Sequence, residues 1–210
     1  FRVPESPGPP FEILTFCSPK ALKTYLVQEN EKLDLLFLDI EFGDCSGLDV
    51  DFRPGNGISV IDDGEVDDIV IAGMGGILIS LIIEADLPKA RSFKKLILQP
   101  RNKSGYLRQK LSEDGFHITG DKLVREGKYI CNVIVAEPGA MTDCPDKGDI
   151  MWEVPFEISD RLLFDEYIDL LISREKKILN GLKQSTNAID DIDVIMNNIE
   201  VLEGILNDKE

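Results

Sequence analysis

The stretch that most constrains this fold runs from Asp67 to Ile83 and reads DDIVIAGMGGILISLII. A short β-branched run is followed by a glycine-rich turn and then by a second run that is apolar on nearly all sides. This order predicts a buried strand, a tight turn and a buried helix. In an open α/β sheet, such a turn lies at the carboxyl end of a strand, where backbone N–H groups face the ligand crevice. The glycines also fit a plain tight turn, and they lack the spacing of the dinucleotide-binding fingerprint.

The composition sets the size of the core and limits the chemistry. A chain of 210 residues with 43% hydrophobic content can bury one substantial core and a small appendage. No apolar run is long enough to span a bilayer, so we expect a soluble protein without membrane contact. The four cysteines form no C-x-x-C pair and there is one histidine, so we expect free thiols and no metal site.

The charge is distributed unevenly along the chain. The net charge is −16, which argues against a protein coated with basic residues for nucleic acid. Residues 87–128 nevertheless contain eleven Lys or Arg against four Asp or Glu, so this part is locally basic. It could hold phosphates on one face, and a solvated surface of ordinary α/β units is the alternative interpretation.

The sequence divides into three parts. Residues 1–10 contain four prolines and are expected to form an extended arm. Residues 11–145 alternate apolar runs with helical patterns, which is typical of an α/β domain. Its strands are expected at 11–17, 33–40, 68–71 and 94–100, its helices at 18–29, 77–83 and 104–114, and an antiparallel pair at 121–126 and 129–136 after an opening segment at 115–118. A hairpin at the edge of a mostly parallel sheet resembles the end of the methyltransferase variant of the doubly wound fold.

The last part, residues 150–210, carries apolar residues at helical spacing with a break near 184–187. This pattern predicts two antiparallel helices in a coiled-coil hairpin, with a helix packed on the main domain as the alternative. The part contains six basic and fourteen acidic residues, so we expect its exposed face to contact a protein partner rather than phosphate.

Several motifs together resemble the TrmK-type tRNA (adenine-N1)-methyltransferase family, which uses S-adenosylmethionine. They cover the chain from about residue 52 to its end, and residues 11–29 match more loosely. The matching segments are RPGNG at 53–57, VDDIVIAGMGG at 66–76, LILQP at 96–100 followed by Leu107 and Arg108, the segment 124–137, and the terminal helical hairpin. The resemblance implies a Rossmann-like methyltransferase fold, S-adenosylmethionine as cofactor and tRNA as partner.

The resemblance also implies roles for individual residues. The floor on which the target base meets the methyl group would be formed by Gly73, Met74, Gly75 and Gly76. The cofactor would be bordered by Gly55, Asn56, Gly57 and Ala72. Nearby phosphates would be held by Arg101, Lys103, Arg108 and Lys110 in the locally basic region. Tyr106 is a candidate for stacking on a base, and an ordinary surface or core tyrosine is the alternative.

The chain departs from the family pattern in two places. The family's first strand ends in an acidic, glycine-containing loop of the form D-I-G-S-D-H-A, and nothing in residues 1–51 has that form. Asn56 stands where the family usually has Asp, which replaces a carboxylate acceptor with an amide. Three hypotheses therefore remain: an active RNA methyltransferase, a catalytically inactive relative that serves as a structural subunit of a larger assembly, and an unrelated small-molecule α/β enzyme. The expected compartment is the cytoplasm, with an organelle matrix as the alternative.

Overall fold

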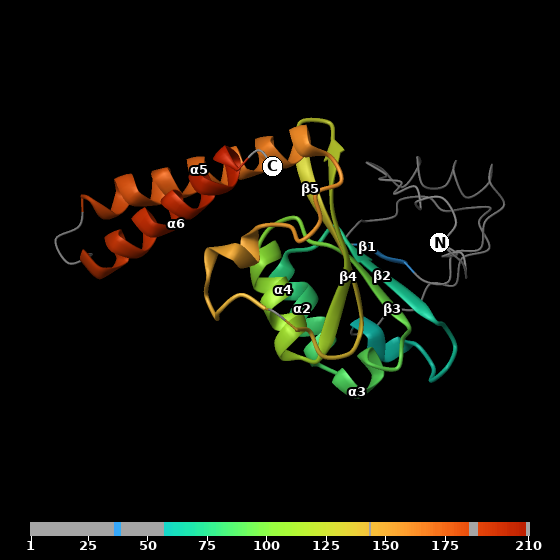
Figure 1. Ribbon diagram of the computed structural model, residues 1–210. Coiled ribbons are helices and arrows are strands. Elements are labelled where there is room, and N and C mark those ends of the chain that lie inside the picture. The colour runs from blue at the N-terminus through green and yellow to red at the C-terminus, as the bar shows by residue number, and fades with distance from the viewer. Residues whose placement is uncertain (1–35, 39–56, 143, 185–188, 209–210) are drawn as a thin grey trace.

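A five-stranded mixed sheet forms the centre of the described chain. The computed structural model describes residues 36–38, 57–142, 144–184 and 189–208. The strand order is β1-β2-β3-β5-β4 (Figure 1). The strands are β1 (Leu36–Leu38), β2 (Asp68–Ala72), β3 (Lys95–Gln99), β4 (Phe116–Glu126) and β5 (Tyr129–Pro138). The first three strands are parallel, and β5 pairs antiparallel with both β3 and β4, so the predicted mixed α/β sheet is confirmed.

Helices cover the sheet and extend from one side of it. They are the 3-10 turns η1 (Gly57–Val60) and η2 (Ile150–Glu153) and the helices α2 (Gly76–Glu84), α3 (Leu87–Ala90), α4 (Ser104–Glu113), α5 (Arg161–Leu182) and α6 (Ile189–Asn207). α2 and α4 lie against one face of the sheet, whereas α5 and α6 lie side by side and project away from it (Figure 1). None of the helices in the described ranges is long and apolar enough to cross a membrane.

The core of the sheet domain is built from alternating side chains of β2 and β3. Ile69 and Ile71 on β2, and Leu96 and Leu98 on β3, are fully buried. They pack with apolar residues of α2 and α4 in one cluster. The side chains between them are only half-buried, so each strand has one fully buried face. On the side away from β3, β2 pairs in parallel with β1, so β2 has a neighbouring strand on both sides.

The β4–β5 hairpin is longer than the sequence predicts. The expected opening segment at 115–118 and the strand at 121–126 form one continuous strand, β4, with an irregularity between Ile118 and Gly120. A β-bulge lets a strand continue across one unpaired residue, and the sequence pattern of alternating residues breaks at the same place. The expected turn at 127–128 is confirmed, and Gly127 takes a φ of 58° there.

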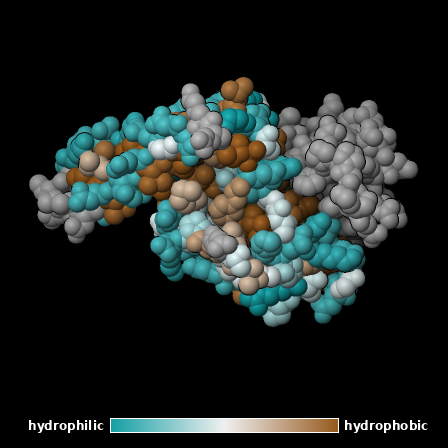
Figure 2. Space-filling model, viewed as in Figure 1, coloured by the Kyte–Doolittle hydropathy of each residue, from teal (hydrophilic) through white to brown (hydrophobic). Residues whose placement is uncertain are grey.

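The C-terminal helices form an antiparallel hairpin, as the sequence predicts. The Asp160 carboxylate caps α5 by accepting from the Leu163 N–H at 3.0 Å. Arg161 at the start of α5 donates to the Ile205 carbonyl near the end of α6, and Asn198 in the middle of α6 donates to Glu175 of α5. A second apolar cluster fills the space between the two helices and extends to β4. Figure 2 shows hydrophobic residues gathered along this hairpin and where it meets the sheet domain. The coiled-coil description stays a prediction.

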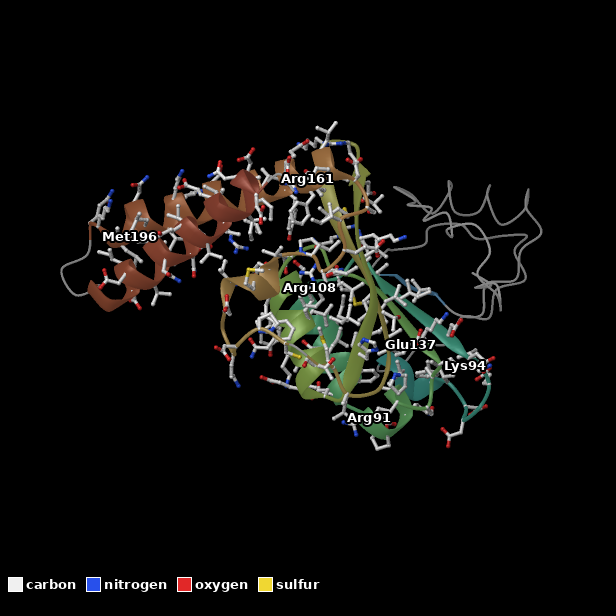
Figure 3. The ribbon with its side chains drawn as sticks, viewed as in Figure 1. Arg91, Lys94, Arg108, Glu137, Arg161 and Met196 are labelled. Carbon is white, nitrogen blue, oxygen red and sulfur yellow. The ribbon has the colours of Figure 1, made fainter. Side chains whose placement is uncertain are left out.

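A buried arginine joins the sheet domain to the segment before α5. Arg108 of α4 is fully buried and donates from Nε and Nη2 to the two carboxylate oxygens of Asp121, both at 2.8 Å. Nη2 also donates to Asn132 Oδ1 at 2.7 Å, and Nη1 donates to the Trp152 carbonyl at 3.1 Å. The Phe156 N–H donates to the same Asp121 carboxylate at 2.8 Å. Burial disfavours the charged form of Arg108, but the Asp121 carboxylate outweighs it, so the pKa of Arg108 is raised. Figure 3 shows the side chain in the interior, where α4, η2 and the sheet meet.

Replacing Arg108 should destabilise the protein far more than replacing an exposed arginine in an ion pair. The variant Arg108→Met leaves the Asp121 carboxylate buried without its cation, so we expect the free energy of unfolding to fall by about 3–5 kcal/mol. Arg125→Met is the matched control, because Arg125 pairs with Glu166 at the surface and such pairs contribute about 0–1 kcal/mol. Urea unfolding of both variants measures the difference. An equal loss of unfolding free energy in the two variants would contradict this account of the buried pair.

Candidate functional site

The glycine turn lies at the carboxyl end of β2, beside the carboxyl end of β3. Residues 73–75 connect the last residue of β2, Ala72, to the first residue of α2, Gly76. Ala72 is paired with Gln99, the last residue of β3, and with Leu38, the last residue of β1. Three parallel strands therefore end at one edge, which is where open α/β sheets bind their ligands.

Hydrogen bonds fasten this turn to the chain that follows β3. The Gly73 N–H donates to both the carbonyl and the side-chain oxygen of Gln99, at 3.2 and 2.9 Å. The Met74 carbonyl accepts from the Arg101 N–H at 2.8 Å, and the Gly76 N–H donates to the Asn102 carbonyl at 2.9 Å. The two loops are thus joined along their length, which holds the turn in one conformation.

Two of the glycines are required by this geometry. Gly73 has a φ of 81°, which residues with a side chain rarely adopt. At Gly76 a Cβ would lie 2.3 Å from the Lys103 carbonyl oxygen, so the first turn of α2 can approach the start of α4 only without a side chain. The predicted glycine turn is confirmed. Its predicted role as the floor beneath a target base, with Met74 and Gly75, stays a prediction.

Of the four predicted cofactor residues, the structure describes Gly57 and Ala72. Gly55 and Asn56 lie outside the described residues. Gly57 begins η1 and lies against the Ile82 side chain of α2, so its backbone is placed by packing on that helix. Ala72 lies at the carboxyl edge beside Gly73, where the prediction put it. The roles of these residues toward a cofactor stay predictions.

The four predicted phosphate-binding residues are placed very differently. Arg101 and Lys103 are exposed in the loop that holds the glycine turn, and neither forms an ion pair with the residues that the structure describes. Arg108 is fully buried in the Asp121 pair, so the prediction that it holds an RNA phosphate is wrong. A fully buried guanidinium whose three nitrogens all donate to groups of the protein cannot reach a phosphate.

Lys110 is engaged by three carboxylates. Its ammonium lies 3.0 Å from Glu84, 3.3 Å from Glu113 and 3.8 Å from Asp114. The nearby Glu84 carboxylate is the main reason that the pKa of Lys110 is raised. Three acidic neighbours cancel the attraction of one ammonium for a phosphate. These carboxylates therefore oppose the predicted binding of an RNA phosphate by Lys110.

Two residues of the site were not identified from the sequence. Gln99 bonds the Gly73 N–H, and Asn102 supplies the carbonyl that bonds Gly76. The signal that could have found Gln99 is a polar residue directly at the carboxyl end of an apolar parallel strand, beside the glycine turn of the neighbouring strand. Asn102 acts through its backbone, so its residue type carried no such signal.

The described site offers positioning rather than a nucleophile or a metal. No group of three His, Cys, Asp or Glu side chains that could hold a metal ion occurs among the described residues. Cys131 on β5 lies near Gln99 and Arg101, and burial, followed by the nearby Glu126, raises the pKa of its thiol. A raised pKa keeps the thiol protonated and weakly nucleophilic at neutral pH.

Comparison with known proteins identifies the family. The model of TrmK, described as tRNA (adenine(22)-N(1))-methyltransferase, matches residues 47–204. The chain belongs to the TrmK family. A curated relative, the tRNA (adenine(22)-N(1))-methyltransferase of Bacillus subtilis strain 168, is 38% identical over 96 residues. That match covers 45% of this chain and 40% of the relative, so it spans less than half the length of either protein.

Solved structures support the Rossmann-like fold of this TrmK-family chain. A Streptococcus pneumoniae protein described as a candidate tRNA (m1A22) methyltransferase, in complex with S-adenosyl-L-methionine, is 26% identical with a TM-score of 0.55. The comparison covers 73% of this chain and 67% of that chain. A Streptococcus agalactiae protein of the NADB-Rossmann superfamily is 24% identical with a TM-score of 0.63, covering 73% of this chain and 66% of that chain. The predicted α/β methyltransferase fold is confirmed.

A methyl group at Gly76 should disrupt the glycine turn of this TrmK-family chain. In Gly76→Ala the added Cβ meets the Lys103 carbonyl, so the free energy of unfolding should fall by about 1–3 kcal/mol. Gly181→Ala in α5 is the matched control, because nothing lies within 4 Å of its Cβ position. The control should gain about 0.5–1 kcal/mol, since alanine favours a helix over glycine. Denaturant unfolding compares the two, and a Gly76→Ala variant as stable as the control would contradict the close approach.

The backbone of Lys103 stores strain that glycine should release. Lys103 has a φ of 55° directly before α4, and it is the one non-glycine residue in the described ranges with a positive φ. The left-handed conformation costs a residue with a side chain about 1–2 kcal/mol, part of which glycine loses again in the unfolded state. Lys103→Gly should therefore raise the free energy of unfolding by up to about 1 kcal/mol. Lys103→Ala keeps the Cβ and should not raise the free energy of unfolding. An equal increase in both variants would show that the backbone of Lys103 is not strained.

Proposed function

We propose that this TrmK-family chain takes part in methylating N1 of adenine 22 in tRNA, with S-adenosylmethionine as the methyl donor. The family match over residues 47–204 is the observation that carries the proposal. The site is consistent with it, because the glycine turn lies at the carboxyl edge of the sheet and is held by the loop after β3. The relative of S. pneumoniae was solved in complex with the same donor, which supports the choice of donor.

In this reaction the methyl group passes directly from the donor to the base, and the protein forms no covalent bond. The N1 lone pair of adenine attacks the methyl carbon in line, the new N–C bond forms, and the carbon–sulfur bond breaks with its electron pair going to sulfur. The sulfonium loses its charge, and the product base carries a positive charge until it releases a proton. Rate acceleration then comes from holding the two reactants in line and excluding water. The step itself requires neither an acid–base pair nor a metal.

The residues around the turn fit a bound donor and base. Between Ala72 and α2 the only side chain in the turn is that of Met74, which packs toward the core. The rest of the turn is backbone, so a flat ring can approach it closely. In this proposal Gly73 and Gly75 form that surface, and Gly57 and Ala72 border the donor. Gly76 is buried against the Lys103 carbonyl, so it holds the turn against the start of α4.

Two cations supply the first contacts to RNA. Arg101 and Lys103 are exposed beside the turn, where they would hold phosphates next to the target adenosine. A base within folded tRNA must leave its stack to reach the turn, and contacts to the flanking backbone help to offset that cost. The acidic α5–α6 hairpin as a protein-binding element and the cytoplasm as the compartment belong to the same proposal, and they rest on charge and on composition alone.

The comparisons offer no support for the alternative of an inactive structural subunit. That hypothesis came from the absence of the family's first acidic loop, from the net charge of −16 and from the acidic helical hairpin. In the structure, β1 gives β2 a parallel neighbour whose carboxyl end lies at the same edge of the sheet as the glycine turn.

Methyl transfer to a tRNA transcript tests the function directly. The protein is incubated with an unmodified transcript and S-adenosylmethionine labelled in the methyl group, and the modified position is mapped by the stop that N1-methyladenine causes in reverse transcription. We expect label and a stop at adenine 22, and neither with a transcript that carries guanine there. Calorimetry with S-adenosylhomocysteine measures donor-site binding separately. No label and no binding heat with the wild-type protein would refute the proposed function.

A further inference from the structure

An exposed apolar strip runs between α2 and α4, beginning at the glycine turn. The sequence predicts α2 to be buried on nearly all sides, and this is wrong for its outer face. Gly76, Ile79, Ser80 and Ile83 are buried, whereas Ile77 is 45%, Leu78 48% and Leu81 55% exposed. On α4, Tyr106 is 42% exposed. Large apolar side chains gathered in one place on a surface commonly mark a binding site.

Contacts at both ends fix how the two helices lie. At their starts, the Gly76 N–H donates to the Asn102 carbonyl at 2.9 Å. Further along, Lys110 of α4 lies 3.0 Å from Glu84 of α2. Both helices follow neighbouring parallel strands, so they run in the same direction. The adjoining surfaces of α2 and α4 therefore run side by side from the glycine turn to the Lys110 ion pairs.

This arrangement brings Tyr106 beside the exposed face of α2. Residues four apart on a helix lie on one face, so Tyr106 lies one turn before Lys110 on the side of α4 that meets α2. On α2, Leu81 lies three residues before Glu84 and Ile77 four residues before Leu81, on the side that meets α4. We call Ile77, Leu81 and Tyr106 the α2–α4 strip.

The ends of the α2–α4 strip differ in charge. Arg101 and Lys103 lie exposed at the end next to the glycine turn, without ion pairs to the residues that the structure describes. At the other end, Lys110 is neutralised by Glu84 and Glu113. A phosphate is therefore attracted only to the end beside the turn, while the strip itself offers an apolar and aromatic surface.

The size of the strip favours a nucleotide over a protein. A stable protein interface takes about 20–30 residues from each partner, far more than three side chains. A single base has one apolar face of about the size of a tyrosine ring, and stacking on aromatic side chains is the usual way in which proteins hold unpaired bases. The cations at one end match the phosphate of such a nucleotide.

We propose that the α2–α4 strip is a stacking surface for an unpaired nucleotide adjacent to the target adenosine, with Arg101 and Lys103 holding its phosphate. The proposal rests on the proposed function, since it assumes that RNA reaches the glycine turn. It adds that aromatic and aliphatic contacts, and not only charge, contribute to RNA affinity. A nucleotide held there keeps its neighbour out of the stack and near the turn.

Stacking and phosphate contacts can be separated by their salt dependence. Binding of the unmodified tRNA transcript is measured by fluorescence anisotropy at several salt concentrations. Tyr106→Ala should weaken the affinity by about fivefold or more at every salt concentration, because one stacked base is lost and no charge is removed. Leu81→Ala should also weaken the affinity at every salt concentration, by a smaller factor. Lys103→Ala should instead lower the slope of log affinity against log salt by about one.

Controls keep stacking distinct from misfolding. Tyr106→Phe retains the ring and should stay within about twofold of wild type, since stacking does not need the hydroxyl group. Leu162→Ala is matched to Leu81→Ala, because Leu162 is an exposed leucine of α5, away from the strip. It should bind RNA as wild type does. All variants should bind S-adenosylhomocysteine with unchanged affinity, which shows that the donor side of the fold is intact.

Three outcomes would overturn the proposal, and they are distinguishable. If wild type methylates tRNA and Tyr106→Ala and Leu81→Ala bind RNA equally well, the strip is not a stacking surface and the proposed function stands. If wild type neither binds nor methylates tRNA, the proposed function fails and this proposal fails with it. If wild type forms a dimer in analytical ultracentrifugation that Leu81→Ala dissociates without loss of RNA affinity, the strip is an interface between two copies of this chain.

Discussion

The placement of the site depends on a charge that is completely buried. A guanidinium removed from water is tolerated only when its nitrogens find acceptors. Each of the three nitrogens of Arg108 donates, and the acceptors are Asp121 on β4, Asn132 on β5 and the Trp152 carbonyl in η2. Satisfying one side chain therefore fixes three separate segments against α4. The loop that precedes α4 carries the hydrogen bonds to the glycine turn, so the turn is held by the segment that leads into the same helix.

The central unit of the fold could be predicted because its signals are local. The β2–turn–α2 unit, β3 and α4 each follow from a periodicity or a glycine within one window of sequence, and the structure places them as expected. The exposed face of α2 could not be predicted in the same way. Ile77 and Leu81 look like core residues in the sequence, but burial depends on which element packs against a face, and that element is distant in the sequence.

The charge of the positive surface likewise depends on contacts between residues that are distant in the sequence. Arg101, Lys103, Arg108 and Lys110 lie within ten residues of one another and look equivalent in the sequence. The structure separates them, because the carboxylate partners of Arg108 and Lys110 include Asp121 and Glu84, which are reached only after the chain has folded. A locally basic stretch therefore predicts where cations occur along the chain, whereas the positive surface is made by those that the fold leaves without a carboxylate partner.

The helical hairpin and the glycine turn share one support, the first turn of α4. The Ser104 hydroxyl lies 3.3 Å from the Tyr167 hydroxyl of α5, and Tyr167 also accepts from Asn132 at 3.2 Å. The Glu153 side chain occupies the space beside Gly105. On its other side the same segment of chain bonds Gly76 through Asn102. A shift of the hairpin relative to the sheet must therefore either break the Tyr167 contacts or move the start of α4.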